Sequence, residues 1–324
     1  MADTMHRQHH DMGGLPGGPV DPTDHSFAPW QKRIEATVRL ALMSPKNRFT
    51  VDQFRRAIEE LPPNLYDSLT YFEKWIAALS NLLVSRGALT QTEIDANVAR
   101  VASLHGAEHD EADEHGRAHD HDHDHDHAPI RSDEPNGPYQ LLADALHVLL
   151  IEKAYFTPAQ HRELIEAIDA SGPAAGARLV VRAWTDPAFK RRLLDDGRVA
   201  CKELGIALNE VNLVAVENTE RVHNVVVCTL CSCYPVFILG RPPDWYKSAA
   251  YRSRVVRDPR AVLAEFGTDI APDRELRVHD STADMRYLVL PMRPRGTEGW
   301  STEQLETIVT RDTMVGVAEC RVRQ

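Results

Sequence analysis

The sequence predicts an α+β protein with a helical N-terminal part and a mixed C-terminal part. Apolar residues recur at helical spacing through residues 30–104 and again from residue 138. From about residue 205 the pattern changes to short runs rich in β-branched residues, with helical segments between and after them. A polar segment at 105–137 separates the two parts. Together these observations predict the α+β class.

The N-terminal part begins with an expected extended arm, residues 1–29, which contains glycines and prolines. Residues 30–104 are expected to form a small helical domain. Its helix "FTVDQFRRAIEEL" opens with a capping box from Thr50 to Gln53. A longer amphipathic helix follows and is expected to end at Gly87, because glycine readily adopts the left-handed conformation at a helix end.

The segment 105–137 is expected to be a disordered linker. It has almost no apolar residues with which to bury a core, and residues 105–134 carry a net charge of -9 of the chain's -11. Alternating histidines and aspartates fill its centre, with imidazoles at His119, His121, His123, His125 and His127. Imidazole binds late divalent transition metals, so the tract is either a low-affinity metal collector or a solvated spacer.

Residues 138–324 are expected to form the second domain. A helical hairpin comes first, with Pro158 at the first position of its second helix. The β-rich runs follow, in "NLVAVEN", "HNVVVCTL", "ELRVHD" and "MRYLVLPMRP".

Composition makes several classes of protein unlikely. No apolar run is long enough for a membrane helix, and the start "MADTMHRQHHDMGG" has no hydrophobic signal core. Five cysteines, three of them clustered, do not suggest a secreted disulfide framework, so we expect a cytoplasmic protein. Outside the acidic segment the charge is close to neutral, so no nucleic-acid partner is expected.

The stretch "VCTLCSCYP" holds the candidate site. Cys231 and Cys233 present two sulfurs, and the backbone nitrogens of Ser232 and Cys233 lie between them. If both amides lose their protons, these atoms form a planar N2S2 chelate, and Cys228 can add an axial sulfur. Amide deprotonation requires a strongly polarising ion, which favours Co(III) or Fe(III) over Zn(II). The sixth position stays open, as a Lewis-acid catalyst requires.

Two other interpretations fit the spacing. A structural zinc site would use the three cysteines and a fourth ligand, and His223 is the nearby imidazole. A redox Cys-x-x-Cys pair would leave Cys233 without a role. Spacing alone leaves all three interpretations open.

A longer set of motifs resembles a known family. The cysteine stretch, "RPPDWYKSAAYRSRVVRDPRAVLAEFG", "RYLVLPMRPRGTEGWSTEQLETIVTRD" and "GARLVVRAWTDPAFKRRLL" are similar to the metal-binding α subunit of nitrile hydratase and to the catalytic subunit of thiocyanate hydrolase. This resemblance covers about 138–318. Residues 30–104, with "HDMGGLP" before them, resemble the N-terminal half of the nitrile hydratase β subunit. The chain therefore resembles a fusion of two subunits that are usually separate, and its catalytic domain is expected to be layered α/β/β/α.

The resemblance implies roles for the cluster. Cys228 would be the axial thiolate, Cys231 a sulfinate and Cys233 a sulfenate, with the amides of Ser232 and Cys233 completing the set. Thr229 resembles the cobalt type, so Co(III) is expected and Fe(III) less so. Cys233 and Ser232 are counted with the catalytic residues.

The resemblance also implies partners for the cluster. In the family, two β-subunit arginines bond to the oxidised sulfurs, and "VDQFRR" aligns the first of them with Arg55. The second belongs to a C-terminal, barrel-like half of the β subunit, for which this chain has no counterpart. A separate polypeptide is expected to supply it, in a hetero-oligomer.

The substrate pocket is expected to include Tyr71, Val236, Phe237 and Asn209. The family usually reads Tyr-Pro-Trp-Pro after the last cysteine, whereas this chain reads "YPVF". A family glutamine near the metal falls at Asn209, which keeps the amide on a shorter side chain.

The implied activity is hydration of a nitrile to its amide, with attack by water or by the Cys233 sulfenate left open. Thiocyanate hydrolysis at the same kind of centre is the close alternative. A cobalt-handling maturation partner, in which the histidine tract is the working part, is the alternative from another class.

Overall fold

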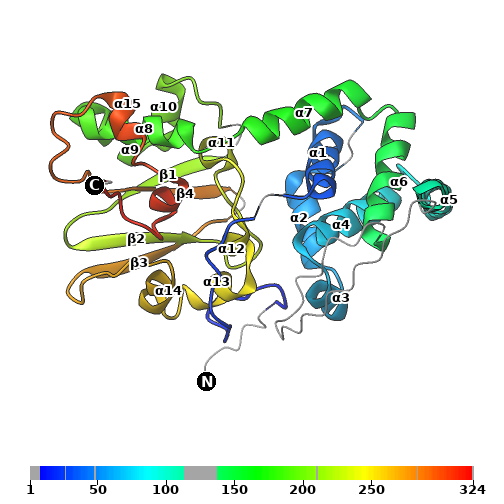
Figure 1. Ribbon diagram of the computed structural model, residues 1–324, viewed down its shortest axis with the longest axis horizontal. Coiled ribbons are helices and arrows are strands. Elements are labelled where there is room, and N and C mark those ends of the chain that lie inside the picture. Colours follow the sequence, from blue (N-terminus) through cyan, green and yellow to red (C-terminus); the bar gives the residue numbers. More distant parts are fainter. Residues whose placement is uncertain are drawn as a thin grey trace. The chain divides into compact units, whose positions relative to one another are not determined.

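The computed structural model describes residues 8–25, 27–46, 49–112, 137–208, 211–282 and 284–322 (Figure 1). Contacts divide the chain into two compact units. The helical unit is Ser26–Ala167, and the mixed unit is Met1–His25 with Ile168–Gln324. The unit boundaries therefore differ from the motif boundaries in the sequence. The hairpin after residue 138 groups with the N-terminal helices, and the N-terminal arm groups with the cysteine motif.

The helical unit begins with five helices. They are α1 (Pro29–Met43), α2 (Val51–Glu59), α3 (Pro63–Ser68), α4 (Tyr71–Ser85) and α5 (Gln91–Ala112). The expected box opens α2: the backbone N–H of Gln53 donates to Thr50 Oγ1 at 3.2 Å, and Thr50 N–H donates to Gln53 Oε1 at 3.0 Å. After α4 the chain turns at Gly87, whose φ of 65° suits a residue without a Cβ.

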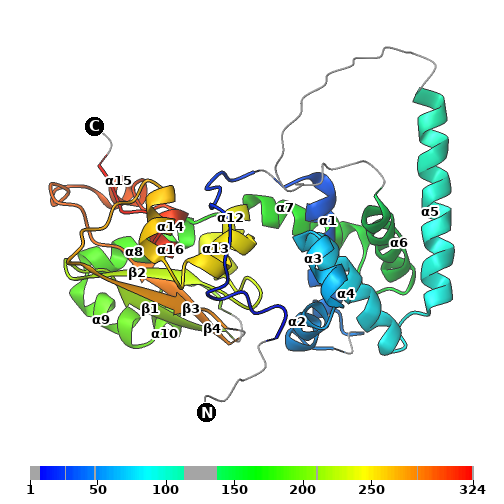
Figure 2. The same cartoon turned by 90° about the horizontal axis from the view of Figure 1, so that it is seen from below.

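The hairpin of α6 (Pro138–Glu152) and α7 (Pro158–Ala170) follows, and the helical unit ends within α7, at Ala167. Leu146 and Leu150 of α6 share one buried core with Ile34 and Val38 of α1. Figure 2 shows α5 beside α6, and the two helices are in contact. Helix α5 runs to Ala112, so its end enters the segment expected to be a linker. The rest of that segment, with the alternating histidines, lies outside the described residues.

The mixed unit alternates helices and strands. Helices α8 (Ala174–Thr185), α9 (Pro187–Asp195) and α10 (Gly197–Glu203) precede β1 (Asn212–Glu217) and β2 (Val222–Val227). Four short helices follow, at α11 (Val236–Leu239), α12 (Asp244–Lys247), α13 (Ala249–Arg254) and α14 (Pro259–Glu265). The chain then forms β3 (Glu275–Asp280), β4 (Met285–Leu290), α15 (Thr302–Glu306) and α16 (Arg311–Val315). The strands coincide with the four β-rich runs, and the mixed helical and sheet class is confirmed.

Two parallel pairs of strands form the sheets of this unit. β1 pairs with β4, ending at Glu217↔Leu290, and β2 pairs with β3, ending at Val227↔Asp280. Helices α9 and α10 contact β1, α14 contacts β3, and β2 contacts β4 (Figure 1). Parallel pairing brings the carboxyl ends of both strands to the same edge.

A reverse turn between β1 and β2 separates the carboxyl edge of the β1–β4 pair from that of the β2–β3 pair. After β1, Thr219 N–H donates to Val222 O at 2.9 Å, and β2 then runs back from the carboxyl end of β1. The carboxyl edge of β2 and β3 therefore lies one strand length away from that of β1 and β4. A buried aromatic cluster with edge-to-face contacts, Trp245, Tyr246 and Tyr251, packs in the core of the unit. In the described part of the chain, every helix is too short or too polar to cross a lipid bilayer.

Candidate metal centre

The three clustered cysteines lie in the loop that leaves the carboxyl end of β2. Cys228 follows the last strand residue, and the loop reaches α11 only at Val236. The sulfurs of Cys228 and Cys231 are 3.5 Å apart, and those of Cys231 and Cys233 are 3.2 Å apart. All three sulfurs lie within 4.8 Å of one another. The loop thus converges three soft ligands on one point, which supports a metal centre.

The backbone of this loop is strained at one residue. Ser232 has a φ of 153°, in a region that side chains rarely occupy. Such a conformation costs on the order of 1–3 kcal/mol and persists only where the surroundings impose it. The strain falls on the residue between the two closest sulfurs. Its amide nitrogen is one of the two that the N2S2 chelate requires.

The sulfurs are crowded and shielded from water. Cys228 and Cys233 are buried, and Cys231 is half-buried. Hydrogen bonds with the Cys228 and Cys231 thiols, and then burial, raise the pKa of the Cys233 thiol. Three neighbouring thiolates repel one another unless a cation neutralises them. Metal binding would supply that cation and release the thiol protons.

An aspartate from the neighbouring strand holds the loop. Asp280 ends β3 directly beside Val227, the last residue of β2. Its Oδ1 accepts from Thr229 N–H at 3.0 Å, and its Oδ2 accepts from Thr229 Oγ1 at 2.6 Å. Burial raises the pKa of Asp280, and the two Thr229 bonds oppose that rise. The parallel register thus places the Asp280 carboxylate opposite Val227, the residue before Cys228, where it can bind Thr229.

Two buried side chains hold the carbonyl groups of the loop. Arg252 on α13 donates from Nε to Cys228 O at 3.2 Å and from Nη2 to Thr229 O at 2.9 Å. Tyr246 on α12 donates from its hydroxyl to Cys233 O at 2.8 Å. Both ends of the cysteine motif are therefore fixed to the helices that follow it.

The N-terminal arm also contacts the loop. Met12 N–H donates to Thr229 O at 3.3 Å, and Gly14 N–H donates to Ser253 O at 2.8 Å. At Gly13 a Cβ atom would come within 3.0 Å of Thr229 Cγ2, so this close approach favours glycine. The arm thus packs against the residue that follows the first cysteine.

Sequence reasoning missed these supporting residues. Asp280, Arg252 and Tyr246 stand far from the motif in the chain, and the arm was expected only to be extended. A polar residue at the carboxyl end of a β-rich run, as in "ELRVHD", was the one available signal for Asp280.

The other predicted site residues have different surroundings. Val236 and Phe237 begin α11 and are half-buried against the core of the mixed unit. Asn209 lies outside the described residues. In the helical unit, Arg55 on α2 forms ion pairs with two carboxylates of its own helix, 3.6 Å from Asp52 and 4.0 Å from Glu59.

Tyr71 begins α4, and its ring contacts those of Phe72 and Trp75. The assignments of Arg55, Tyr71 and Asn209 to the site stay predictions.

The imidazole weighed as a fourth zinc ligand is used elsewhere. His223 Nε2 is 2.7 Å from Gly316 O, and its Nδ1 is 3.4 Å from Asn218 Nδ2. Because a carbonyl can only accept, Nε2 carries the proton and Nδ1 accepts from the amide. His223 is fully buried, and burial lowers its pKa. Both ring nitrogens are engaged, which removes His223 as a zinc ligand.

Two segments of the chain match models of known protein families. Residues 138–318 match the family model of the nitrile hydratase α chain. The chain belongs to this family. Residues 5–125 match the N-terminal model of the nitrile hydratase β subunit, so the chain joins segments of both subunits.

Several nitrile hydratase and thiocyanate hydrolase subunits are similar to the α-type segment. The cobalt-containing nitrile hydratase α subunit of Pseudonocardia thermophila is 54% identical over 176 residues, covering 53% of this chain and 86% of the relative. The γ subunit of thiocyanate hydrolase from Thiobacillus thioparus is 43% identical, covering 56% and 79%. The β-type segment is 40% identical to the Pseudomonas putida nitrile hydratase β subunit over 89 residues, 40% of that subunit's length.

Solved structures agree with the family assignment. A mutant of the Fe-type nitrile hydratase from Comamonas testosteroni Ni1 matches at 45% identity and a TM-score of 0.53, covering 55% of this chain and 87% of that one. A recombinant thiocyanate hydrolase matches at 42% identity and a TM-score of 0.54, covering 57% and 91%.

Proposed function

We propose that this chain is the metal-binding subunit of a nitrile hydratase, which hydrates a nitrile to its amide at a Co(III) centre. The observation that carries the proposal is the convergence of three sulfurs around the strained Ser232. The family assignment supports the reaction class, and the cobalt-containing relatives support the metal.

The donor set fits a trivalent ion better than zinc. Among the described residues the ligand cluster consists of the three cysteines, and the nearby His223 is engaged by Gly316 and Asn218. In our proposal Cys228, Cys231 and Cys233 hold the ion through sulfur, and the amide nitrogens of Ser232 and Cys233 complete the set. A bound ion would supply Lewis-acid polarisation of the nitrile. The chain supplies the rigid loop, since Thr229 is fixed by Asp280 and Arg252.

The choice of cobalt over iron rests on the identity of one residue. Thr229 follows the first cysteine, as in the cobalt type of the family. Its hydroxyl donates to Asp280 Oδ2 and its methyl group packs towards Gly13. We further propose that Cys231 and Cys233 become a sulfinate and a sulfenate, because oxygenation weakens sulfur donors and adds hydrogen-bond acceptors.

Several parts of the proposal rest on sequence. The domain boundaries at 29, 104 and 137 come from composition and hydrophobic periodicity, and the family motifs agree with them. The resemblance implies Tyr71, Val236, Phe237 and Asn209 as pocket residues, and a partner polypeptide like the C-terminal half of a β subunit. A cytoplasmic location is proposed from the few, clustered cysteines. The β-type relatives support the partner, since this chain covers 40% of the Pseudomonas putida β subunit.

Thiocyanate hydrolysis is the second candidate. The γ subunit of thiocyanate hydrolase is similar over more than half of this chain, and "YPVF" departs from the usual nitrile hydratase pattern. To decide between the two reactions, the chain is purified from cobalt-fed cells together with the proposed partner polypeptide, encoded by a neighbouring gene. Cobalt per chain, amide release from a panel of nitriles and consumption of thiocyanate are then measured. We expect bound cobalt and amide release; thiocyanate consumption alone would reassign the reaction, and neither activity would defeat the proposal.

Arg55 offers a test of the β-type half. We expect Arg55→Lys to lose about tenfold or more in turnover while cobalt stays bound, because lysine keeps the charge but loses the forked donor geometry. The matched control is Arg56→Lys, a neighbouring exposed arginine paired with Glu60. Wild-type turnover in Arg55→Lys and Arg55→Ala would remove this residue from the site.

A further inference from the structure

A pocket of about 410 Å³ opens at the carboxyl edge of the β1–β4 pair. Its lining comes from α8, α9, the ends of both strands and the segment after β4. This volume lies in the usual range for small-molecule sites. In sheets with parallel strands, ligands bind in the crevice outside the carboxyl ends.

The pocket is separate from the cysteine cluster. Thr219 lines it, and β2 then runs from Val222 to Val227 before Cys228 begins the metal loop. Six strand residues span about 20 Å at roughly 3.3 Å per residue. A ligand here would therefore not touch the metal ligands.

Arg293 is the oriented cation of the pocket. Its Nε donates to Thr297 Oγ1 at 3.0 Å, and its Nη2 donates to Thr297 O. Thr297 is fully buried and donates in turn to Pro294 O at 2.8 Å, so the guanidinium is held by the fold. Among the described residues, Arg293 forms no ion pair. Backbone hydrogen bonds chiefly lower the pKa of the exposed Glu298, and the charge of Arg293 lowers it further. The N–H groups that Thr297 does not use can receive an anion.

The second cation of the pocket is already paired. Lys190 on α9 forms an ion pair with Glu217 at the end of β1. Two cations and one carboxylate leave the lining with a net charge of about +1, which suits a monoanion better than a dianion.

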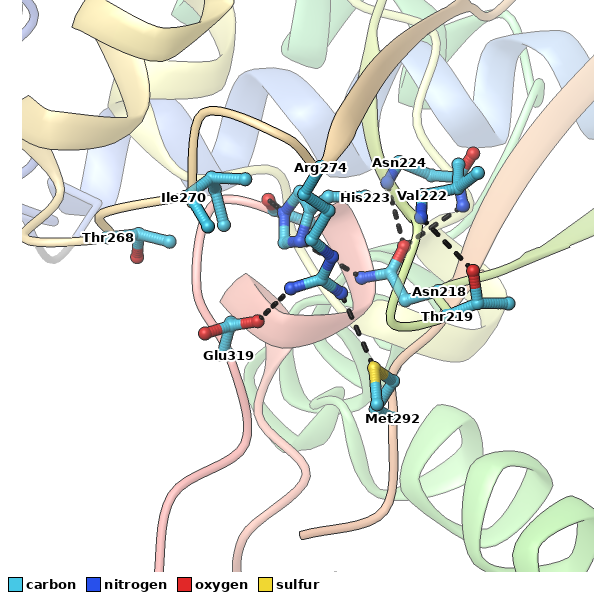
Figure 3. Close-up of polar contacts among 12 residues, drawn as sticks. Asn218, Thr219, Val222, His223, Asn224, Thr268, Ile270, Arg274, Met292 and Glu319 are labelled. Atoms are coloured by element: carbon cyan, nitrogen blue, oxygen red, sulfur yellow. Dashed lines mark hydrogen bonds and ion pairs between the residues drawn. The ribbon is translucent and has the colours of Figure 1, made fainter.

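Much of the remaining lining is suited to apolar contact. The indole N–H of Trp184, its only hydrogen-bond donor, donates to Pro291 O at 2.8 Å, and Pro187 and Met292 add apolar surface to the pocket. Arg274 donates to the Met292 sulfur at 3.5 Å, which Figure 3 shows.

Asn218 belongs to the lining but is engaged inward. Its Oδ1 accepts from the Asn224 backbone at 2.7 Å and from the Asn224 side chain at 3.0 Å (Figure 3). Its Nδ2 donates to His223. The amide is therefore satisfied by the protein, and the oriented charge of Arg293 is the main polar feature open to a ligand.

We propose that this pocket binds a small monocarboxylate with a short apolar tail. The carboxylate pairs with the Arg293 guanidinium, and the tail lies against Trp184, Pro187 and Met292. Glu217 disfavours a second negative charge, which separates this class of ligand from phosphate.

The test uses the full metal-loaded chain with its partner subunit. Pentanoate, 1-pentanol and inorganic phosphate are titrated separately by isothermal calorimetry at fixed ionic strength. We expect pentanoate to bind and the other two to bind at least tenfold more weakly. The visible absorption of the metal centre is followed in the same titration and should not change.

Three variants locate the binding. Arg293→Gln should weaken pentanoate binding at least tenfold, and Arg293→Lys should give an intermediate value if the glutamine variant does not fold. The matched control is Arg295→Gln, because Arg295 lies on the same segment, is exposed and pairs with Glu220. Unchanged binding in Arg293→Gln and Arg293→Lys overturns the proposal. So does equal binding of pentanol or phosphate, or an absorption change that follows the pentanoate isotherm, which would place the carboxylate at the metal.

Discussion

Among the described residues, a histidine pair and a cysteine cluster both bring together potential metal ligands, and they differ in how they are built. In the helical unit the rings of His147 and His161 lie 4.2 Å apart. In the mixed unit three cysteine sulfurs lie within 4.8 Å of one another. Both groups consist of residues that bind metals, and each has one half-buried member, His147 and Cys231.

The histidine pair is a packing element. His161 Nε2 is 3.1 Å from Thr37 Oγ1 and 3.2 Å from Arg33 O, and its ring stacks on Phe156. Burial lowers the pKa of both imidazoles, that of His147 to about 4. The pair is neutral near pH 7, and it joins α6 and α7 to α1.

The cysteine cluster differs in strain and in convergence. Ser232 holds an unfavourable φ, and the sulfurs meet chiefly one another. Asp280, Arg252 and Tyr246 hold the backbone of the loop and leave the sulfurs to converge. The comparison teaches that a metal site shows itself by ligands that converge at the cost of strain, whereas burial alone indicates packing.

The largest effect should come from the cysteines. We expect Cys231→Ala or Cys233→Ala to abolish cobalt retention and activity, by at least a hundredfold, because each removes one of the three sulfurs that would hold the ion. Cys201→Ala is the matched control, since Cys201 is fully buried and lies outside the cluster. Cobalt per chain and amide release are measured for each variant. Full activity in Cys231→Ala or Cys233→Ala would contradict the proposed chelate.

A smaller loss should follow when the support of the loop is weakened. In Asp280→Asn the two charge-assisted bonds to Thr229 become neutral ones, and the Thr229 hydroxyl must turn to accept from Nδ2–H, which costs about 1–2 kcal/mol. We expect turnover and cobalt retention to fall by roughly tenfold at the same pH. Asp273→Asn, at an exposed aspartate, is the control. If Asp280→Asn holds cobalt as long as wild type, the aspartate is not needed to position the loop.

The histidine pair should make folding stability depend on pH, and it should not bind metal. The pKa of His147 is lowered in the folded state, so below about pH 6.5 the unfolded chain binds more protons and stability falls as pH falls. Allowing for partial exposure, the loss is at most about 1 kcal/mol per pH unit down to about pH 4.

Denaturant unfolding at pH 7, 6 and 5 measures this dependence. His147→Leu should flatten it, and His25→Gln, at an exposed histidine, should not. The same slope in all three proteins would show that the pair is not the source.

A third group of histidines, between His119 and His127, should affect loading alone. This group lies outside the described residues, and the prediction rests on its sequence. Replacing all five imidazoles with asparagine keeps the length of the tether but removes the ligands. We expect turnover per cobalt to stay within about twofold, and cobalt per chain to fall only when cobalt is scarce. Equal loading in low- and high-cobalt cultures would make the tract a spacer.

Much of this protein could be predicted from local patterns. The capping box at Thr50, the four β-rich runs and the cysteine spacing depend on residues a few positions apart. Backbone geometry and chelate chemistry act over such short ranges, and the family motifs lie in the same stretches. The sequence therefore determined the α+β class, the family and the three metal-binding candidates.

Only the tertiary structure decided what surrounds them. Strand register, not proximity in the chain, places Asp280 beside Thr229, and the packing of α13 brings in Arg252. His223 stands five residues from Cys228, yet its Nε2–H donates to Gly316 O, so the ring serves the core and not the metal. The pocket with Arg293 exists because β1 and β4 end at one edge. Contacts between distant segments depend on how strands pair and helices pack, and no local pattern encodes that information.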